Sequence, residues 1–272
     1  MFARLIQARQ VELPPMPGTA AEVLDVCQQE DADAARLSAV IHKDQTVASN
    51  VLRVANSAAY SGQVPCSSLQ QAVSRLGMQM VTEITMAVSV RGRMFTNEAC
   101  AELLDSLWKH SVMTAFFTKE IARMRRRNVE IAFLCGLLHD VGKAVLLGSV
   151  DRVLGSEELT VPRDELYEAL HEQHVEAGLL LADEWKLPAL VAEAIACHHD
   201  NHLAKSHADM AMTVCLADHL SHLIAPSQLA APPSEEQLRA HDVLVGLNIY
   251  PDELDQLLAM RERALEVTEG LQ

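Results

Sequence analysis

Aromatic residues are scarce in this chain of 272 residues, at 4% of the sequence. Hydrophobic residues nevertheless make up 49%, and alanine, leucine and valine supply most of them. Such a mixture favours helices over sheets, whose strands draw heavily on aromatic side chains. No stretch alternates apolar and polar residues in the manner of a half-buried strand. The sequence therefore predicts an all-α protein.

Long apolar runs and paired cysteines are also missing. No stretch approaches the roughly 18 uninterrupted apolar residues that a membrane-spanning helix needs, so we expect no contact with a membrane. Arg4 and Arg9 lie near the amino end without an apolar segment beside them, and we expect no signal peptide. The six cysteines form no C-x-x-C pair, which indicates buried, reduced thiols. These features together predict a cytoplasmic location.

Basic residues are outnumbered, because 22 Lys and Arg stand against 37 Asp and Glu and give a net charge of -15. This acidic balance argues against non-specific binding to nucleic acid. One basic cluster, Arg123 and Arg125–Arg127, ends a predicted helix, where cations stabilise the carboxyl end. We therefore interpret this cluster as a helix terminus rather than a basic groove.

Helix signals recur along the whole chain. Gly77 is typical of a residue that ends a helix, and Pro251 of one that begins a helix. Capping patterns mark other starts: Thr19 with Glu22, Asp33, Asp44, Ser68 with Gln71, and Ser234 with Gln237. Apolar periodicity predicts helices near residues 20–28, 33–42, 44–55, 68–77, 78–90, 130–147, 163–184, 188–197 and 208–224, and one or two helices over 97–127.

Histidine is abundant, with 12 in the chain, and several lie in apolar helical sequence. A single buried histidine is usually a hydrogen-bonded core residue. When several histidines and carboxylates are buried, each of them needs a polar or charged partner. One cluster of divalent ions would serve as the partner of all of them. Imidazole and carboxylate suit Fe, Mn, Co, Ni or Zn. The residues that lie in such apolar surroundings are His139, Asp140, His198, His199 and Asp218.

The order of these residues resembles the HD superfamily of metal-dependent phosphohydrolases. His110 matches the first histidine of that pattern, and His139–Asp140 matches its central doublet. Asp218 matches its distal aspartate. The resemblance implies an HD-like helical bundle in which these four residues bind a metal ion.

Additional positions match the superfamily members that bind two or more metals. His174 and His198 match extra histidines of those members, so the resemblance implies two divalent transition-metal ions with Asp140 bridging them. His199 matches as a third-site ligand, a phosphate contact or an outer-shell donor. Lys143 matches the lysine that follows the doublet, as a phosphate contact, although a solvated lysine at a helix end is an equal alternative.

The first half of the chain resembles a second family, the HDOD domains of bacterial signal-transduction proteins. Its hallmarks there are Leu13–Pro17, Ile41–Asp44, Leu52–Ala58 and Ala72–Gly77. In the second half Trp185–Pro188 also fits the family, so the resemblance covers about residues 13–222. The resemblance implies three parts: an N-terminal helical lobe at 1–98, an HD-like metal-binding lobe at 99–229, and a C-terminal helical extension at 230–272 that packs on the HD lobe.

Two departures qualify these resemblances. Gln45 stands where HDOD domains usually have proline. No Gly-Tyr-Pro follows His198–His199, as it does in the HD-type phosphodiesterases of cyclic-di-GMP, so we do not assign that substrate. Most HDOD domains are thought to have lost the metal residues, whereas this chain keeps the full set.

Three functions follow as hypotheses. The first is a metal-dependent phosphohydrolase acting on a phosphate-containing small molecule or nucleotide, with Asp140, Lys143 and His199 as catalytic residues. The second is a regulatory scaffold in which the metals are structural and the N-terminal lobe binds a signalling protein. The third, a di-iron oxygenase, uses the same types of ligand.

The remaining histidines receive other roles. His171 lies three residues before His174, on a similar face of the predicted helix. We expect it to contact His174 on the side away from the metal. We expect His202, His207, His219 and His222 to lie on the surface.

Overall fold

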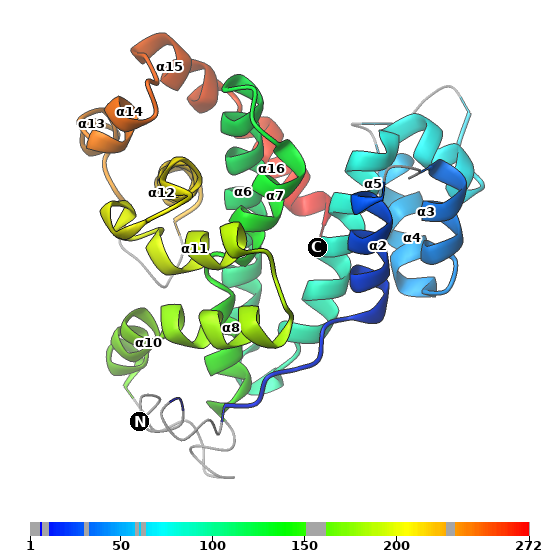
Figure 1. The fold of residues 1–272 in the computed structure, drawn as a ribbon, viewed down its shortest axis with the longest axis horizontal. Coiled ribbons are helices and arrows are strands. Elements are labelled where there is room, and N and C mark those ends of the chain that lie inside the picture. The colour runs from blue at the N-terminus through cyan, green and yellow to red at the C-terminus, as the bar shows by residue number, and fades with distance from the viewer. Residues whose placement is uncertain are drawn as a thin grey trace. The chain divides into compact units, whose positions relative to one another are not determined.

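The computed structural model describes residues 6, 11–29, 33–57, 60, 64–150, 162–226 and 232–271, and these residues form helices and no strand (Figure 1). The prediction of an all-α fold is therefore confirmed. The helices are α2 Gly18–Gln28, α3 Ala34–Ile41, α4 Gln45–Ala55, α5 Leu69–Met94, α6 Ala101–Met124, α7 Val129–Leu138, α8 Val141–Gly148, α10 Arg163–Glu184, α11 Ala189–Cys197, α12 Ala208–Ile224, α13 Glu235–Arg239, α14 Asp242–Gly246, α15 Pro251–Ala259 and α16 Arg261–Gly270, with the 3-10 turns η1 Glu98–Cys100 and η2 Asn201–Leu203.

Side-chain caps open several helices where the sequence predicts them. The Asp33 carboxylate accepts from the amide three residues later at 2.7 Å, and Asp44 does the same at 3.1 Å. Ser234 and Gln237 form the predicted reciprocal capping box. Each cap satisfies amides that the first turn of a helix leaves without a partner, and so fixes where the helix begins.

The capping box predicted for Thr19 and Glu22 is wrong. Helix α2 begins at Gly18, so Pro17 takes the N-cap position. The Thr19 hydroxyl instead donates to the Asp44 carboxylate at 3.1 Å, while Glu22 pairs with Lys43. Both side chains therefore connect α2 to the segment that opens α4.

The single helix predicted for 130–147 is also wrong, because the chain breaks it into α7 and α8. Asp140 lies between them with φ -105° and ψ 11°, outside the helical range. The break turns the backbone where the His139–Asp140 doublet lies, which lets two neighbouring side chains face one centre. A second break occurs at Gly77, whose φ of 81° interrupts α5 where the sequence predicts a helix end.

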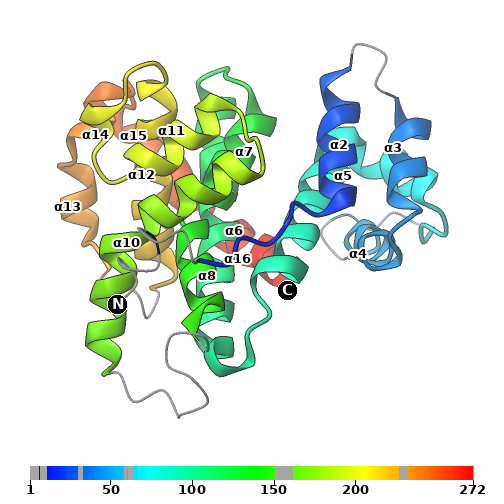
Figure 2. The same cartoon turned by 60° about the horizontal axis from the view of Figure 1, so that its bottom comes forward.

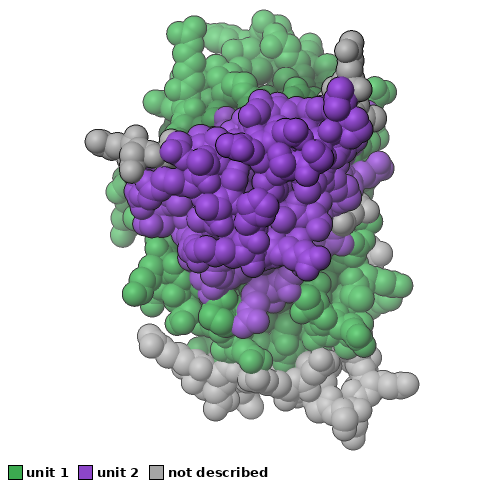
Figure 3. Space-filling view, turned by 90° about the vertical axis from the view of Figure 1, so that its right-hand side faces the viewer, with its two compact units in different colours: residues 1–15, 94–265 green, residues 16–93, 266–272 purple. Residues whose placement is uncertain are grey.

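The chain folds as two compact units (Figure 3). Unit 1 contains residues 1–15 and 94–265, and unit 2 contains residues 16–93 and 266–272. The three-part division expected from the sequence, with boundaries at 98 and 229, stays a prediction.

In unit 1, α6 forms the centre of the core (Figure 2). Helices α7, α8 and α12 pack against it, and α10 packs against α8 and α11. The side chains of Trp108 and Phe117 on α6 are almost fully buried. The segment Val129–Gly148 is apolar enough to cross a membrane by composition, but 89% of its most apolar window is buried inside the protein.

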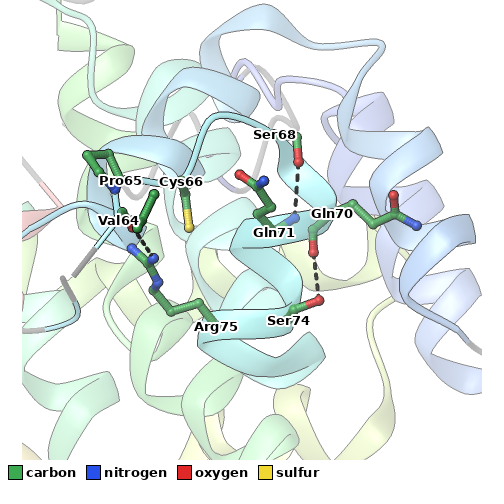
Figure 4. Close-up of a pocket in the computed structure, with 8 residues that line it drawn as sticks. All are labelled: Val64, Pro65, Cys66, Ser68, Gln70, Gln71, Ser74 and Arg75. Atoms are coloured by element: carbon green, nitrogen blue, oxygen red, sulfur yellow. Dashed lines mark hydrogen bonds between the residues drawn. The ribbon is translucent and has the colours of Figure 1, made fainter. Parts of the chain in front are cut away.

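Unit 2 contains a surface pocket of about 730 Å³ at the start of α5 (Figure 4). Arg75 is the charged residue among those that line it, and its guanidinium donates to the carbonyls of Ala55 and Val64. These bonds secure the turn before α5. The lining residues are Val64, Pro65, Cys66, Ser68, Gln70, Gln71, Ser74 and Arg75.

Candidate metal centre

Five segments of unit 1 bring the seven predicted ligands together. Helix α6 carries His110, the α7–α8 turn carries His139 and Asp140, α10 carries His174, α11 leads into His198 and His199, and α12 carries Asp218. All are buried except His199, which is exposed at the edge of the cluster. Residues more than 100 positions apart in the sequence thus meet in one buried polar cluster.

One half of the cluster consists of His110, His139 and Asp218, which form a group that could hold an ion. The Asp218 Oδ1 atom lies 2.9 Å from His110 Nε2 and 3.6 Å from His139 Nε2. The two Nε2 atoms are 3.3 Å apart. Two imidazoles and one carboxylate therefore face a common point.

The other half consists of Asp140, His174, His198 and His199. His174 Nε2 lies 3.4 Å from His198 Nε2 and 3.1 Å from His199 Nε2. Asp140 Oδ1 lies 3.4 Å from His174 Nε2 and 3.6 Å from His198 Nε2. This half therefore offers three imidazoles and a carboxylate oxygen.

Asp140 lies between the two halves. Its Oδ1 faces His174 and His198, whereas its Oδ2 lies 3.5 Å from His139 Nε2. A carboxylate that presents one oxygen to each side has the arrangement needed to bridge two ions.

The hydrogen bonds made by the Nδ1 atoms of two imidazoles indicate that their Nε2 atoms are available to bind a metal. His174 Nδ1 donates to the carbonyl of His171 at 2.7 Å, and His198 Nδ1 donates to that of Ile195 at 2.9 Å. In a neutral imidazole whose proton is on Nδ1, the Nε2 atom carries a lone pair and no hydrogen. These lone pairs face Asp140 Oδ1, a buried oxygen without a hydrogen-bond donor. A divalent cation fits this meeting of acceptors, because it satisfies all three together.

Both carboxylates are ionised in the buried cluster. Burial by itself raises the pKa of Asp140 and Asp218, but their neighbours more than reverse this effect. Lys143 and His139 bring the pKa of Asp140 well below its usual value, and His110 and His139 do so for Asp218. The cluster therefore presents negative charge to a cation.

The histidines divide in their protonation. Burial lowers the pKa of His174 to about 4, so this imidazole is neutral at pH 7 and free to ligate. Burial also lowers the pKa of His139, but Asp140 and Asp218 outweigh burial and raise it. Metal binding at His139 would therefore displace a proton, which makes the affinity depend on pH.

Lys143 lies inside the cluster rather than at the edge of an open cleft. Its Nζ atom is 2.6 Å from Asp140 Oδ2, and the side chain is 5% exposed. The ammonium thus neutralises the oxygen of Asp140 that faces His139. The solvated alternative for Lys143 is excluded by this burial.

His222 belongs to the cluster, and the prediction that it lies on the surface is wrong. Its Nε2 atom is 3.4 Å from Asp218 Oδ1, and its ring stacks on His110 at 4.2 Å. Burial lowers the pKa of His222 to about 4. Its spacing of four residues from Asp218 on one helix is the signal that could have revealed it.

The other histidines are placed as follows. His171 supports His174 through its backbone carbonyl, while its own side chain is exposed. His202 is exposed, as predicted. His207 and His219 are half-buried.

Two glycines that the sequence analysis missed permit the approach of the helices. A Cβ atom on Gly142 would lie 1.8 Å from the carbonyl oxygen of His174, and one on Gly136 would lie 2.6 Å from the Cα of Ala115. The first contact brings α10 against the start of α8, and the second brings α7 against α6. Both glycines flank the doublet, and that position in an apolar run is the available signal.

We expect Gly142→Ala to lower the free energy of unfolding by about 1–3 kcal/mol, the usual cost of inserting a methyl group into a packed contact. The methyl group would displace the His174 backbone, so metal uptake should weaken as well. Denaturant unfolding and metal titration measure the two effects. Gly148→Ala, where a Cβ would meet nothing within 4 Å, is the matched control. Equal stability of the two variants would contradict the close packing.

Among known proteins, an uncharacterized protein of Treponema pallidum (strain Nichols) is 25% identical over 226 residues, which cover 80% of this chain and 44% of that protein. Ribonuclease Y of Mycoplasma genitalium is 30% identical over 112 residues, which cover 41% of this chain and 18% of the enzyme. The chain thus spans less than half the length of these relatives.

Solved structures share the fold along nearly the whole chain. A Shewanella amazonensis protein named "Putative metal-dependent phosphohydrolase" has a TM-score of 0.75 at 19% identity, with coverage of 100% of this chain and 96% of that one. An HDOD domain protein of unknown function from Geobacter sulfurreducens has a TM-score of 0.75 at 21% identity, with coverage of 98% and 96%. The profile of the HDOD domain matches residues 13–201. The chain belongs to the HDOD family.

Proposed function

We propose that this HDOD protein is a metal-dependent phosphohydrolase that uses two divalent transition-metal ions, of Fe, Mn, Co, Ni or Zn. The observation that carries this proposal is the meeting of the His174 and His198 lone pairs with the donor-free Oδ1 of Asp140. In a protein interior, acceptors left facing one another are costly. A bound cation would remove this cost, because it would interact favourably with all of these acceptors.

The ligands divide between the ions according to the two halves of the cluster. His110, His139 and Asp218 would hold one ion. His174, His198 and His199 would hold the other, with Asp140 between them. Ions in such a pair supply Lewis-acid polarisation of a phosphoryl oxygen and lower the pKa of water.

Lys143 and His199 are the residues that we assign to the phosphate. In the structure the Lys143 ammonium balances Asp140 at 2.6 Å. With cations bound, Asp140 would no longer need the Lys143 ammonium, which could then contact a phosphate oxygen through a charge-assisted hydrogen bond. His199 is the exposed member of the cluster and would contact the substrate as it enters.

The substrate class that we propose is a small phosphomonoester, phosphodiester or nucleotide. The ribonuclease Y relatives, named for RNA cleavage, favour including a phosphodiester. The net charge of -15 disfavours a long polyanion held by backbone contacts alone. A cytoplasmic location, without a membrane, is consistent with such a substrate.

A second candidate, a regulatory scaffold with structural metals, is favoured by one observation. Six of the seven ligands and Lys143 are buried, so the cluster is largely enclosed by protein. Structural metal sites are typically closed by protein groups. In this alternative the protein would act through a signalling partner.

The deciding experiment is an assay of chelator-free, metal-loaded protein on phosphomonoesters, phosphodiesters, nucleotides and short RNA. Hydrolysis that requires metal and disappears in Asp140→Asn supports the enzyme. Bound metal without turnover of any ester supports the scaffold. Consumption of dioxygen with an organic substrate would instead identify an oxygenase built on the same ligands.

A further inference from the structure

A second group of metal-ligating side chains lies on α12 beside the main cluster. Cys215 and His219 are four residues apart, so they share one stripe of the helix. Asp218 and His222 occupy the neighbouring stripe and face the main cluster. One helix thus carries two separate sets of ligand-type side chains.

His241 completes the second group from another segment. It is the N-cap residue of α14, which packs against α12. Its ring centroid lies 4.7 Å from that of His219, with the two rings at 61°. The fold therefore brings a thiol and two imidazoles together outside the residues that match the HDOD profile.

The spacing of the donor atoms suits one ion. One donor atom from each of the three residues lies within 4.8 Å of the others. Around a tetrahedral zinc ion, with Zn–S and Zn–N bonds of about 2.3 and 2.0 Å, neighbouring donors lie roughly 3.3–3.6 Å apart. Both imidazoles are half-buried, so small rotations of their rings close the difference.

The Nδ1 atom of each imidazole lies beside a carbonyl or carboxylate oxygen. His219 Nδ1 donates to the carbonyl of Cys215 at 2.8 Å, which leaves Nε2 free to ligate. His241 Nδ1 lies 3.1 Å from Asp242 Oδ1 and 3.2 Å from the amide of Val243. His241 Nδ1 accepts the amide hydrogen of Val243, so ligation through Nε2 would require the ring proton to move to Nδ1 and be donated to Asp242, in the carboxylate–histidine–metal arrangement common in zinc sites.

We propose that Cys215, His219 and His241 bind one thiophilic divalent ion of the zinc type. A thiolate with two imidazoles selects such an ion over the oxygen-preferring cations. Burial raises the pKa of the Cys215 thiol to about 12, so releasing its proton to solvent costs part of the energy of the sulfur–metal bond and makes binding stronger at higher pH. The bound ion fastens α14 to α12, the helix that supplies Asp218 to the main cluster.

The test is cobalt substitution of the full-length protein. A cobalt–thiolate bond gives a charge-transfer absorption band that nitrogen and oxygen ligands do not give, so the band separates this site from the main cluster. We expect the band in the wild type and its loss in Cys215→Ser. His241→Asn should also lose it, because asparagine keeps the N-cap acceptor and the fold but removes the imidazole.

Two controls make the result specific. Cys197→Ser tests the cysteine next to His198 of the main cluster, and His202→Ala tests a nearby exposed histidine. Both should keep the band and the cobalt stoichiometry, whereas Cys215→Ser and His241→Asn should each bind one ion fewer. Absence of the band in the wild type, its survival in Cys215→Ser, or its loss in Cys197→Ser would each overturn the proposal.

Discussion

The variant Asp140→Asn is expected to lose both ions of the main cluster. Asp140 directs one oxygen to each half, so a single substitution removes a ligand and a negative charge from both sites. Loss of an outer-shell partner alone costs roughly 10–100-fold in metal affinity, so the loss here should exceed about 100-fold. Metal content by mass spectrometry and calorimetric titration measure it.

The Asp140→Asn variant needs a separate control that shows whether it still folds. Asp140→Asn leaves the Lys143 ammonium buried without its partner, and breaking a buried ion pair costs about 3–5 kcal/mol. The double variant Asp140→Asn/Lys143→Met removes both charges and should recover much of this stability without recovering metal. Asp200→Asn, at an exposed carboxylate next to His199, should keep both ions. Retention of two ions by folded Asp140→Asn would refute the bridging role.

The second large effect is expected for Lys143→Met. If the ammonium moves from Asp140 to the substrate phosphate, its removal should lower kcat/KM by about 10²–10³-fold, the usual cost of one donor to the transition state. Metal content should stay intact, because the ions themselves neutralise Asp140. Methionine keeps the length of the side chain and suits a buried position.

Steady-state kinetics and metal analysis of the same preparation separate the outcomes for Lys143→Met. Lys109→Met, at a solvent-accessible lysine on α6 that pairs with Asp105, is the matched control and should leave kcat/KM unchanged. An unchanged kcat/KM in Lys143→Met would exclude the phosphate role. A loss of metal would instead assign the lysine to the integrity of the site.

The sequence was sufficient for the features that depend on local chemistry. The caps at Asp33 and Asp44 follow from side-chain oxygens placed before apolar helices. The seven candidate ligands could be selected because a buried imidazole or carboxylate needs compensation, and because their order along the chain resembles that of the HD superfamily. The structure brings all seven together, while their roles as ligands stay a prediction.

The features that the sequence did not reveal depend on contacts between distant segments. Thr19 has the pattern of a capping box, yet α2 begins one residue earlier, at Gly18, and the Thr19 hydroxyl donates to Asp44, 25 positions away. Gly142 matters only because α10 passes against it. His222 lies beside Leu223 and Ile224 on a largely apolar helix, and the packing of α12 against α6 buries it on His110.

Anomalous diffraction from crystals of chelator-free protein loaded with Mn²⁺ tests the central claim most directly. Mn²⁺ prefers oxygen and nitrogen ligands, so it should avoid the Cys215 site. We predict two peaks, one among His110, His139 and Asp218 and the other among His174, His198 and His199. Asp140 should lie between the peaks, with Lys143 displaced from it. No peak in the cluster, with Lys143 still paired to Asp140, would contradict the account.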